Sequence, residues 1–406
     1  MSTNSVFYYT DGTTSTSSNA VILQTSYNRT KPLQSVSIGT IVTSLGTSCF
    51  ANCASLTSIT IPSSVTSLGV RCFQDCTSLP SITIPSSVTS LGIYCFYNCN
   101  KITNITIPSN VTSLGANCFE RCASLTSITI PSSITTLPSQ CFQDCTSLTS
   151  ITIPETVTSL GNLCFQRCTS LTSITIPPNV TALGESCFDG CTLLTSITIP
   201  SSVTFTSLGH FCFQNCTSLT SITIPSTVTS LGNSCFYNCN KLTNTTIPET
   251  VTSLGNDCFY NCTLFTNITI PSNVTNLGHA CFSGCTSLTS ITIPSSVTFT
   301  SLGIRCFQNC TSLTSITIPS TVTSLGDSCF NNCNKLTSIT IPSGVTSLGT
   351  NCFQSCTSLT SITIPSSVTF TSLGISCFQS CTSLTSITIP SSVTSLGTSC
   401  FQSCTS

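Results

Sequence analysis

The segment Cys-Phe-x-x-Cys recurs sixteen times along this 406-residue chain and contains all 32 of its cysteines. The first copy begins at Cys49 and the last at Cys400. Successive copies begin 23 residues apart, except at three steps of 25, where two residues are inserted: Phe205-Thr206, Phe299-Thr300 and Phe370-Thr371. A fixed period of this length predicts a solenoid in which each repeat forms one coil. One unit copied many times is more typical of a binding or building surface than of an enzyme.

The first half of each repeat has the pattern of a strand. In residues 56–78, Ile59 and Ile61 alternate with polar residues, which predicts a half-buried strand of about six residues. Pro62 has no N–H group and ends the strand. Val65 and Leu68 then return to the core.

The second half contains the cysteines, and its spacing fits one short helical turn with a single buried face. We expect Cys72, Phe73 and Cys76 to fill the core of this coil. In the next coil, Cys95, Phe96 and Cys99 occupy the same positions.

Residues 33–406 hold the sixteen repeats, and residues 1–32 precede them. A lone coil leaves both flanks of its core in water, so the repeats must stack. All coils wind in the same sense, which predicts one long parallel sheet of about sixteen strands, roughly 75–80 Å in length at the usual strand spacing. The fold class expected is an α/β-type repeat solenoid.

The two ends of the array differ from the repeats. Residues 6–9 and 21–23 are apolar and enclose a polar stretch, which favours a hairpin that caps the first coil; a disordered tail is the alternative. No atypical unit follows the sixteenth repeat, so we expect no C-terminal cap. That end is therefore a candidate for self-association.

The consensus L-x-x-I-x-I-P-x-x-V-x-x-L-G-x-x-C-F-x-x-C resembles the BspA-like leucine-rich repeat over residues 33–406. Cys-Phe in place of the usual Ala-Phe is similar to a variant found in surface proteins of anaerobic protists. The resemblance implies a right-handed curved superhelix with its sheet on the concave side and short helical turns on the other. It also implies non-enzymatic binding, typically cell adhesion, at the cell surface or outside the cell.

The cysteines allow three interpretations. Buried, reduced thiols are favoured, because every coil has the same pair at core positions and free cysteine packs as a small apolar residue. Disulfides between adjacent coils are the second interpretation, because the coil spacing falls within the reach of a disulfide. Clusters of thiolates around a metal are the third. We predict no metal and no cofactor.

Two outward positions of each strand form a file of small polar residues. The second position is Thr in every coil after the first, and the first position is Ser or Asn. We call this file the strand ribbon, and it is either a solvated face, a contact face for a protein or glycan, or an ice-binding ladder. Its candidate binding residues are Ser58, Thr60, Ser81, Thr83, Asn104, Thr106, Ser127 and Thr129.

Sequence variety is concentrated around the cysteines. The two residues after Leu-Gly and the two between Phe and Cys hold most charges and all tyrosines of the repeats, namely Tyr94, Tyr97, Tyr237 and Tyr260. If recognition is sequence-specific, these positions can encode it better than the uniform strands.

Composition excludes several partners. Charged residues make up 5% of the chain, and the net charge of −1 offers no basic stripe for a nucleic acid. No apolar run is long enough for a membrane span. The N-terminus lacks the basic and apolar regions of a conventional signal peptide, so a cytoplasmic location is the alternative to the cell surface.

We therefore predict a non-enzymatic leucine-rich-repeat protein with an extended protein-interaction or adhesion surface. The alternative is a structural solenoid that assembles end to end into fibres or a surface layer. No catalytic constellation is present: the two histidines have no carboxylate or nucleophile placed beside them by sequence.

Overall fold

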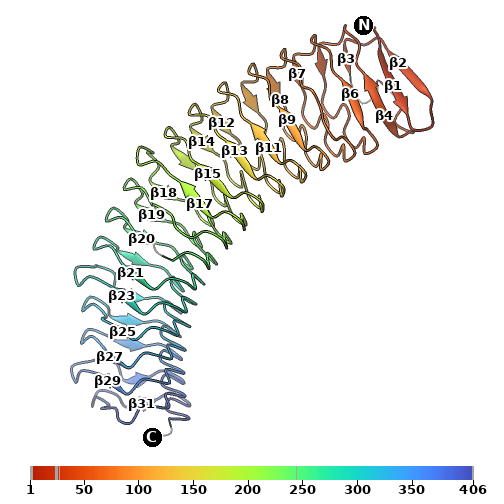
Figure 1. Ribbon diagram of the computed structural model, residues 1–406. Helices are drawn as coiled ribbons and strands as arrows, with labels where there is room; N and C mark the ends of the chain where they lie inside the picture. The colour runs from red at the N-terminus through yellow and green to blue at the C-terminus, as the bar shows by residue number, and fades with distance from the viewer. Residues whose placement is uncertain (1–2, 23–25, 27, 244, 405–406) are drawn as a thin grey trace. The chain divides into compact units, whose positions relative to one another are not determined.

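The computed structural model describes residues 3–22, 26, 28–243 and 245–404. It divides into two compact units, Met1–Thr204 and Phe205–Ser406, here called unit 1 and unit 2. Within each unit the chain winds as a β-solenoid whose coils stack on one another, with about sixteen coils in total (Figure 1).

Most coils contribute two short strands, which line up with their equivalents in neighbouring coils as two files. In unit 1 the first file contains β4 (Leu33–Ser37), β6 (Ser58–Thr60), β9 (Asn104–Thr106), β11 (Ser127–Thr129), β13 (Ser150–Thr152), β15 (Ser173–Thr175) and β17 (Ser196–Thr198). Its second file contains β3 (Val21–Ile22), β5 (Ser44–Leu45), β7 (Ser67–Leu68), β8 (Ser90–Leu91), β10 (Ser113–Leu114), β12 (Thr136–Leu137), β14 (Ser159–Leu160) and β16 (Ala182–Leu183).

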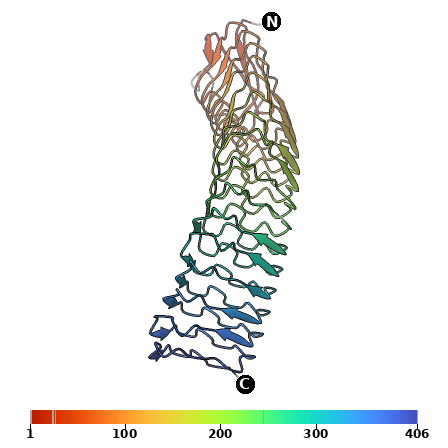
Figure 2. The ribbon, with the colours of Figure 1, turned by 90° about the vertical axis from the view of Figure 1, so that its left-hand side faces the viewer.

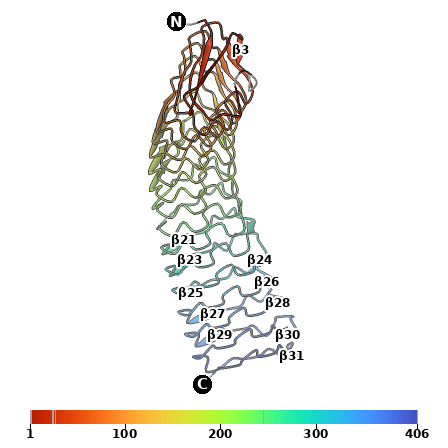
Figure 3. The same ribbon diagram turned by 90° about the vertical axis from the view of Figure 1, so that its right-hand side faces the viewer.

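Unit 2 repeats this arrangement. Its first file contains β21 (Asn267–Thr269), β23 (Ser290–Thr292), β25 (Ser315–Ile316), β27 (Ser338–Thr340) and β29 (Ser361–Thr363). Its second file contains β18 (Ser207–Leu208), β19 (Ser230–Leu231), β20 (Ser253–Leu254), β22 (Asn276–Leu277), β24 (Ser301–Leu302), β26 (Ser324–Leu325), β28 (Ser347–Leu348), β30 (Ser372–Leu373) and β31 (Ser395–Leu396). The two files lie on different sides of the coils of unit 2 (Figures 2 and 3).

The prediction of one long parallel sheet was wrong. Pairing within the files is parallel and in register, but it is divided into separate sheets of two to five strands. The strands are only two or three residues long in most coils, so few hydrogen bonds join each pair. Pro80 has no N–H group to donate. The first-file strand of its coil is replaced by an isolated bridge between Thr83 and Thr106.

The prediction of short helical turns was also wrong, because the described residues contain no α-helix. In the cysteine segment, bonds three residues apart such as Cys76 N–H to the Phe73 carbonyl, 3.2 Å, do form. However, Arg71 and Asp75 have φ angles of 55° and 59°, in the left-handed region, and the same two positions are left-handed in every described coil. A left-handed residue every fourth position interrupts a right-handed helix.

Backbone N–H groups of this segment, at the left-handed residues and between them, point toward the following coil. Arg71, Phe73 and Asp75 each donate to a carbonyl of the next coil at 2.8 Å. In the second file the direction is reversed, and Gly69 N–H donates back to the Leu45 carbonyl of the preceding coil, also at 2.8 Å. Each coil is thus hydrogen-bonded to the coil before it and to the coil after it. These bonds satisfy backbone groups that would bond within the segment if it were a helix.

The phenylalanine of the Cys-Phe-x-x-Cys segment is buried in the core of every coil except the last. In unit 1, Phe73 and Phe96 stack with their centroids 5.4 Å apart and their planes 4° from parallel, and both are fully buried. The same stacking runs through unit 2, for example between Phe353 and Phe378 at 5.5 Å. The inserted residue Phe299 is also buried.

The N-terminal residues form a hairpin, but not the predicted one. β1 (Ser5–Tyr9) pairs antiparallel with β2 (Thr14–Ser17) and, on its other edge, with β4 of the first coil. Residues 21–22 instead form β3, which pairs in parallel with β5 and begins the second file; Leu23 lies outside the described residues. The pattern of apolar residues did not distinguish a hairpin partner from the first strand of a file.

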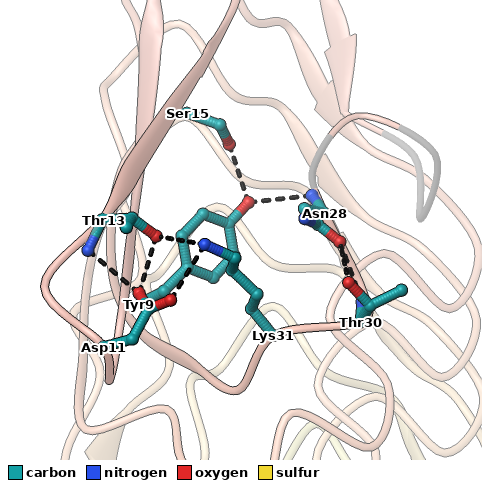
Figure 4. A network of polar contacts seen from close by, with 7 residues as sticks. All are labelled: Tyr9, Asp11, Thr13, Ser15, Asn28, Thr30 and Lys31. Carbon is teal, nitrogen blue, oxygen red and sulfur yellow. Dashed lines mark hydrogen bonds and ion pairs between the residues drawn. The ribbon is translucent and has the colours of Figure 1, made fainter.

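A polar network fixes this hairpin to the segment that leads into the first coil (Figure 4). The Tyr9 hydroxyl contacts the Ser15 hydroxyl at 2.7 Å and accepts the Asn28 N–H at 2.8 Å. Lys31 pairs with Asp11 at 2.8 Å, and hydrogen bonds from Lys31 and Thr13 hold the pKa of Asp11 well below its usual range. Phe7 and Tyr9 are buried beside the first coil.

Candidate functional site

The variable residues lie together on one side of the coils. We call this side the turn face; in each coil it runs from the first residue after Leu-Gly to the second cysteine, as in Ile93–Cys99. Within it, the residues before the first cysteine and before the second cysteine have left-handed backbone. Their side chains therefore occupy repeated, fixed places on an otherwise uniform scaffold.

Backbone bonds between coils set the register of this face in unit 1. Arg71 N–H donates to the Ile93 carbonyl at 2.8 Å, Tyr94 N–H to the Ala116 carbonyl at 3.0 Å, and Asn117 N–H to the Ser139 carbonyl at 3.1 Å. Side chains 23 residues apart are consequently neighbours.

A pocket of about 470 Å³ opens on the turn face of unit 1. Most of its lining comes from two positions of the repeat in successive coils: the residue before the first cysteine and the residue after the phenylalanine. The lining residues are Ser48, Ala51, Asn52, Arg71, Gln74, Tyr94, Tyr97, Asn117, Glu120 and Gln140.

Two tyrosines and two arginines dominate this pocket and its rim. Tyr94 and Tyr97 are half-buried and meet edge to face, with centroids 5.5 Å apart and planes at 76°. Arg71 lies over the Tyr94 ring and Arg121 over the Tyr97 ring, each at 5.5 Å from the centroid. Burial raises the pKa of Tyr97, so its hydroxyl keeps its proton at neutral pH.

Glu120 is the acidic group of the pocket and is 6% exposed. Its carboxylate accepts a hydrogen bond from the Asn117 side chain at 2.5 Å and lies 3.8 Å from the Arg121 guanidinium. Burial outweighs both contacts and raises the pKa of Glu120. Arg121 also approaches Asp144 at 3.8 Å, so its charge is shared between two carboxylates.

The predicted strand-ribbon residues lie on the first file, on exposed positions of unit 1. Their hydroxyls differ from those of the neighbouring threonines. Thr126, for example, donates to the Thr103 carbonyl of the preceding coil at 3.1 Å. Within the described part of the chain, by contrast, the Thr106 and Thr129 hydroxyls have no hydrogen-bond partner. The ribbon is therefore open to solvent or to a ligand, although nearly identical from coil to coil.

The other two predicted tyrosines lie in unit 2. Tyr237 and Tyr260 stack face to face, with centroids 4.8 Å apart and planes 5° from parallel. Burial raises the pKa of Tyr237. Their arrangement differs from that of Tyr94 and Tyr97, because they occupy the same repeat position in successive coils.

The cysteines line the interior; 31 are buried and Cys404 is partly exposed. In most coils the second cysteine of the pair makes a contact that the sequence did not suggest. Cys99 Sγ–H donates to the Phe73 carbonyl of the preceding coil at 3.0 Å, and Cys356 donates to the Phe330 carbonyl at 3.2 Å. Sulfur thus supplies both packing volume and a hydrogen bond.

No three His, Cys, Asp or Glu side chains within the described ranges are arranged to hold a metal ion. Both histidines instead support the backbone of unit 2. His210 Nδ1 accepts the Asn233 N–H at 2.8 Å, and His279 Nδ1 accepts the Ile304 N–H at 2.9 Å. In the part of the chain that the structure covers, no helix has the length and apolar character needed to cross a bilayer.

Sequence reasoning selected Tyr94 and Tyr97 but missed Arg71, Asn117 and Gln140. All three belong to the repeat position of Tyr94, at steps of 23 residues. Aligning the coils at that position would have placed them in one column with Tyr94. That alignment could not have shown that the column borders a pocket.

Comparison with known proteins relates the chain to a family and to solved structures. The model of the BspA type leucine rich repeat region matches residues 20–148, 112–208, 206–304 and 296–406. A leucine-rich repeat protein from Bacteroides ovatus is 32% identical, with a TM-score of 0.71 over 84% of this chain and 85% of that one. A leucine rich cell surface protein from Faecalibacterium prausnitzii is 24% identical, with a TM-score of 0.47 over 89% of this chain and 93% of that one.

No curated protein matches the chain. The family model covers the whole repeat array, and the Bacteroides ovatus structure shares its architecture. The chain therefore belongs to the family of BspA-type leucine-rich repeat proteins.

Proposed function

We propose that the chain is a non-enzymatic binding protein whose turn face serves as a protein-interaction or adhesion surface. One observation carries this proposal. The backbone repeats from coil to coil, whereas turn-face side chains vary and, in unit 1, gather two tyrosines and two arginines around a pocket. Tyrosine and arginine are the residue types most enriched among energetically important interface residues.

The strand ribbon is a weaker candidate for specific recognition. Its exposed Ser, Asn and Thr side chains offer hydroxyls and amides but hardly any variation along a unit. We propose it as a secondary contact surface. We expect the strand ribbon to lie on the concave side of the superhelix, as the family resemblance implies.

A paired substitution tests which surface makes contact. Ile93 is 44% exposed on the turn face beside Tyr94, and Thr106 is exposed on the ribbon. We expect Ile93→Arg to reduce the binding of protein-coated beads to immobilised extracellular-matrix proteins and to cultured cells, because it adds a bulky charge next to the pocket. Thr106→Arg should leave binding within error. If both variants adhere like the parent, or if the parent does not adhere, the proposal is wrong.

The location proposed is the cell surface. The Faecalibacterium prausnitzii protein is described as a cell surface protein, and adhesion requires access to the outside. Biotinylation of intact cells with a membrane-impermeant reagent should label the protein. Labelling only after lysis would contradict both the location and the adhesive role.

The second candidate is a structural solenoid that assembles end to end. It is favoured by the near-identity of the coils, because the backbone bonds that join coils within a unit, such as Thr66 N–H to the Thr43 carbonyl at 2.9 Å, could join coils of two molecules in the same way. Light scattering across a hundredfold range of concentration distinguishes the two. A constant monomer mass removes this candidate, and a mass that rises with concentration favours it.

A further inference from the structure

We propose that the pocket around Tyr94 and Tyr97 binds a neutral oligosaccharide. This inference rests on the proposed binding function and assigns a ligand class to one site on the turn face.

The two tyrosine rings suit a pyranose. They meet at 76°, so they present two differently oriented surfaces, and both are only partly covered by protein. A sugar ring has a face of C–H groups, which packs against the electron-rich face of an aromatic ring. The hydroxyls at its edge would then point toward the polar side chains around the tyrosines.

Those polar side chains include both donors and acceptors. Among the described residues, the Tyr94 and Tyr97 hydroxyls and the Asn52 amide have no side-chain hydrogen-bond partner, and the Arg71 guanidinium has no acceptor. A hydroxyl group both donates and accepts, so an array of sugar hydroxyls can satisfy such a mixture.

The charges favour a neutral ligand over an acidic one. Arg121 is shared between Glu120 and Asp144, which leaves Arg71 as the cation of the pocket without an ion pair in the described part of unit 1. Arg71 and Glu120 are the charged residues of the lining and their formal charges are opposite, so the lining carries no net charge that would attract a sulfated or sialylated sugar. Of the lining residues only Ala51 is aliphatic, so the apolar surface of the pocket comes mainly from the two tyrosine rings, which suits the C–H face of a sugar.

The pocket is also preorganised, which lowers the entropy lost on binding. Arg71, Tyr94, Asn117 and Gln140 all project from left-handed backbone with φ between 55° and 60°. Each donates its N–H to the following coil at 2.8 to 3.1 Å. The side chains are therefore anchored on a bonded scaffold and not on a mobile loop.

The test uses the full chain and a panel of immobilised oligosaccharides. The neutral members end in galactose, glucose, mannose, fucose, N-acetylglucosamine or N-acetylgalactosamine, and each has a sialylated or sulfated counterpart where one exists. We expect at least one neutral oligosaccharide to bind, and to bind more tightly than its acidic counterpart. Saturation-transfer NMR with the free sugar then gives the affinity.

Variants identify the site. Tyr97→Ala should weaken binding by about tenfold or more, the loss expected for removing about 1.4 kcal/mol of contact energy. Tyr94→Asn and Arg71→Asn, which suit left-handed backbone, should weaken it severalfold.

Tyr237→Ala in unit 2 is the matched control, because Tyr237 stands at the repeat position of Tyr97, and it should not change binding. Tyr97→Phe keeps the ring and serves as the second variant if Tyr97→Ala loses its circular dichroism signal.

Three results would overturn the inference: no neutral oligosaccharide binds, an acidic one binds more tightly, or Tyr97→Ala binds like the parent. Failure here is distinct from failure of the proposed function. If the protein still adheres to enzymatically deglycosylated matrix proteins and Ile93→Arg abolishes that adhesion, the ligand is protein, so the binding role stands and the saccharide assignment falls.

Discussion

Left-handed backbone at two positions of each coil explains a regularity in the side chains found there. In every described coil, the residue before the first cysteine and the residue before the second have φ near 50° to 75°. None of them is Val, Ile or Thr, whereas Asn, Ser, Asp and Arg are common. The residue just before the first of these positions, which is not left-handed, includes Ile93 and Thr350. β-branched side chains collide with the backbone in the left-handed region, and Asn or Asp tolerate it.

Two adjacent positions test this explanation. Asn351 has a φ of 56°, and Thr350 precedes it with ordinary backbone. We expect Asn351→Val to lower the free energy of unfolding by about 1–2 kcal/mol, because valine must adopt a strained conformation. Thr350→Val should change it by less than about 0.5 kcal/mol, as for most surface substitutions.

Urea unfolding followed by circular dichroism measures both values. Among the residues that the structure describes, neither side chain has a hydrogen-bond partner that the substitution would remove: the bonds at these residues, such as Asn351 N–H to the Ile375 carbonyl at 2.9 Å, come from the backbone. Equal midpoints for the two variants would show that backbone strain does not select the residues on the turn face.

At the scale of the coil, the glycine of Leu-Gly lies where the backbones of neighbouring coils approach most closely. A Cβ atom on Gly92 would lie 2.4 Å from the backbone carbonyl carbon of Gly69. The Gly92 N–H also donates to the Leu68 carbonyl at 2.9 Å. In one coil Pro138 occupies this position, and its nitrogen has no hydrogen to donate.

Gly92→Ala should therefore destabilise the fold by about 2 kcal/mol, because the coils must separate locally to admit the methyl group. Gly344→Ala is the matched control. A Cβ atom there meets its nearest neighbour, the Ser320 carbonyl oxygen, at 3.6 Å. With no clash, alanine should stabilise the chain by about 0.4–1 kcal/mol by restricting the unfolded state. Thermal unfolding gives both signs in one experiment, and a stable Gly92→Ala variant would show that the coils adjust freely.

Coil-scale features differ in how far the sequence determines them. The 23-residue period and the apolar positions predict the solenoid, and the structure buries Cys72, Phe73 and Cys76 in its core. The helical turn was mispredicted, because a spacing of one and three residues fits one helical turn as well as a bend between two left-handed residues. The sequence nevertheless contains a signal for the left-handed positions, because Val, Ile and Thr are absent from these two positions of the repeat in every coil.

The candidate site was less predictable than the fold. Tyr94 and Tyr97 stood out as rare aromatic residues at variable positions, but the pocket also needs Asn52, Glu120 and Gln140 from other coils. How deeply these side chains are buried depends on how successive coils are offset, which a one-dimensional repeat does not specify. The second file of strands was missed for a different reason: its strands are only two residues long, too short to show an alternation of apolar and polar residues.

At the scale of the whole molecule, the buried thiols couple folding to pH. Burial raises the pKa of cysteines throughout both units, among them Cys95, Cys99, Cys352 and Cys356, and raises that of Cys285 to about 12. The ordinary value is 9.0. Between these values the folded chain keeps protons that the unfolded chain releases. The free energy of unfolding is therefore fully retained below about pH 9 and falls as the pH rises above it.

Many thiols act together, so the expected effect is large. Well above pH 9, each thiol that ionises only on unfolding lowers the free energy of unfolding by about 1.4 kcal/mol per pH unit. We expect the urea midpoint to change little between pH 7 and 8 and to fall steeply between pH 9 and 10. Labelling with a thiol reagent at pH 8 should be slow in the folded state and rapid in urea, because the reagent needs an accessible thiolate.

Removing one pair of thiols separates this effect from the titration of lysines and tyrosines. Cys352→Ala with Cys356→Ala deletes both cysteines of one coil in unit 2 and leaves every other ionisable group in place. The loss of sulfur volume lowers stability at all pH values, so the informative quantity is the slope. Above pH 9 the slope of the free energy of unfolding against pH should be shallower by two protons, about 2.7 kcal/mol per pH unit, if that coil unfolds with the rest of the unit. An unchanged slope would mean that these thiols are already accessible to water in the folded chain, and the interior position of the Cys-Phe-x-x-Cys segments would have to be abandoned.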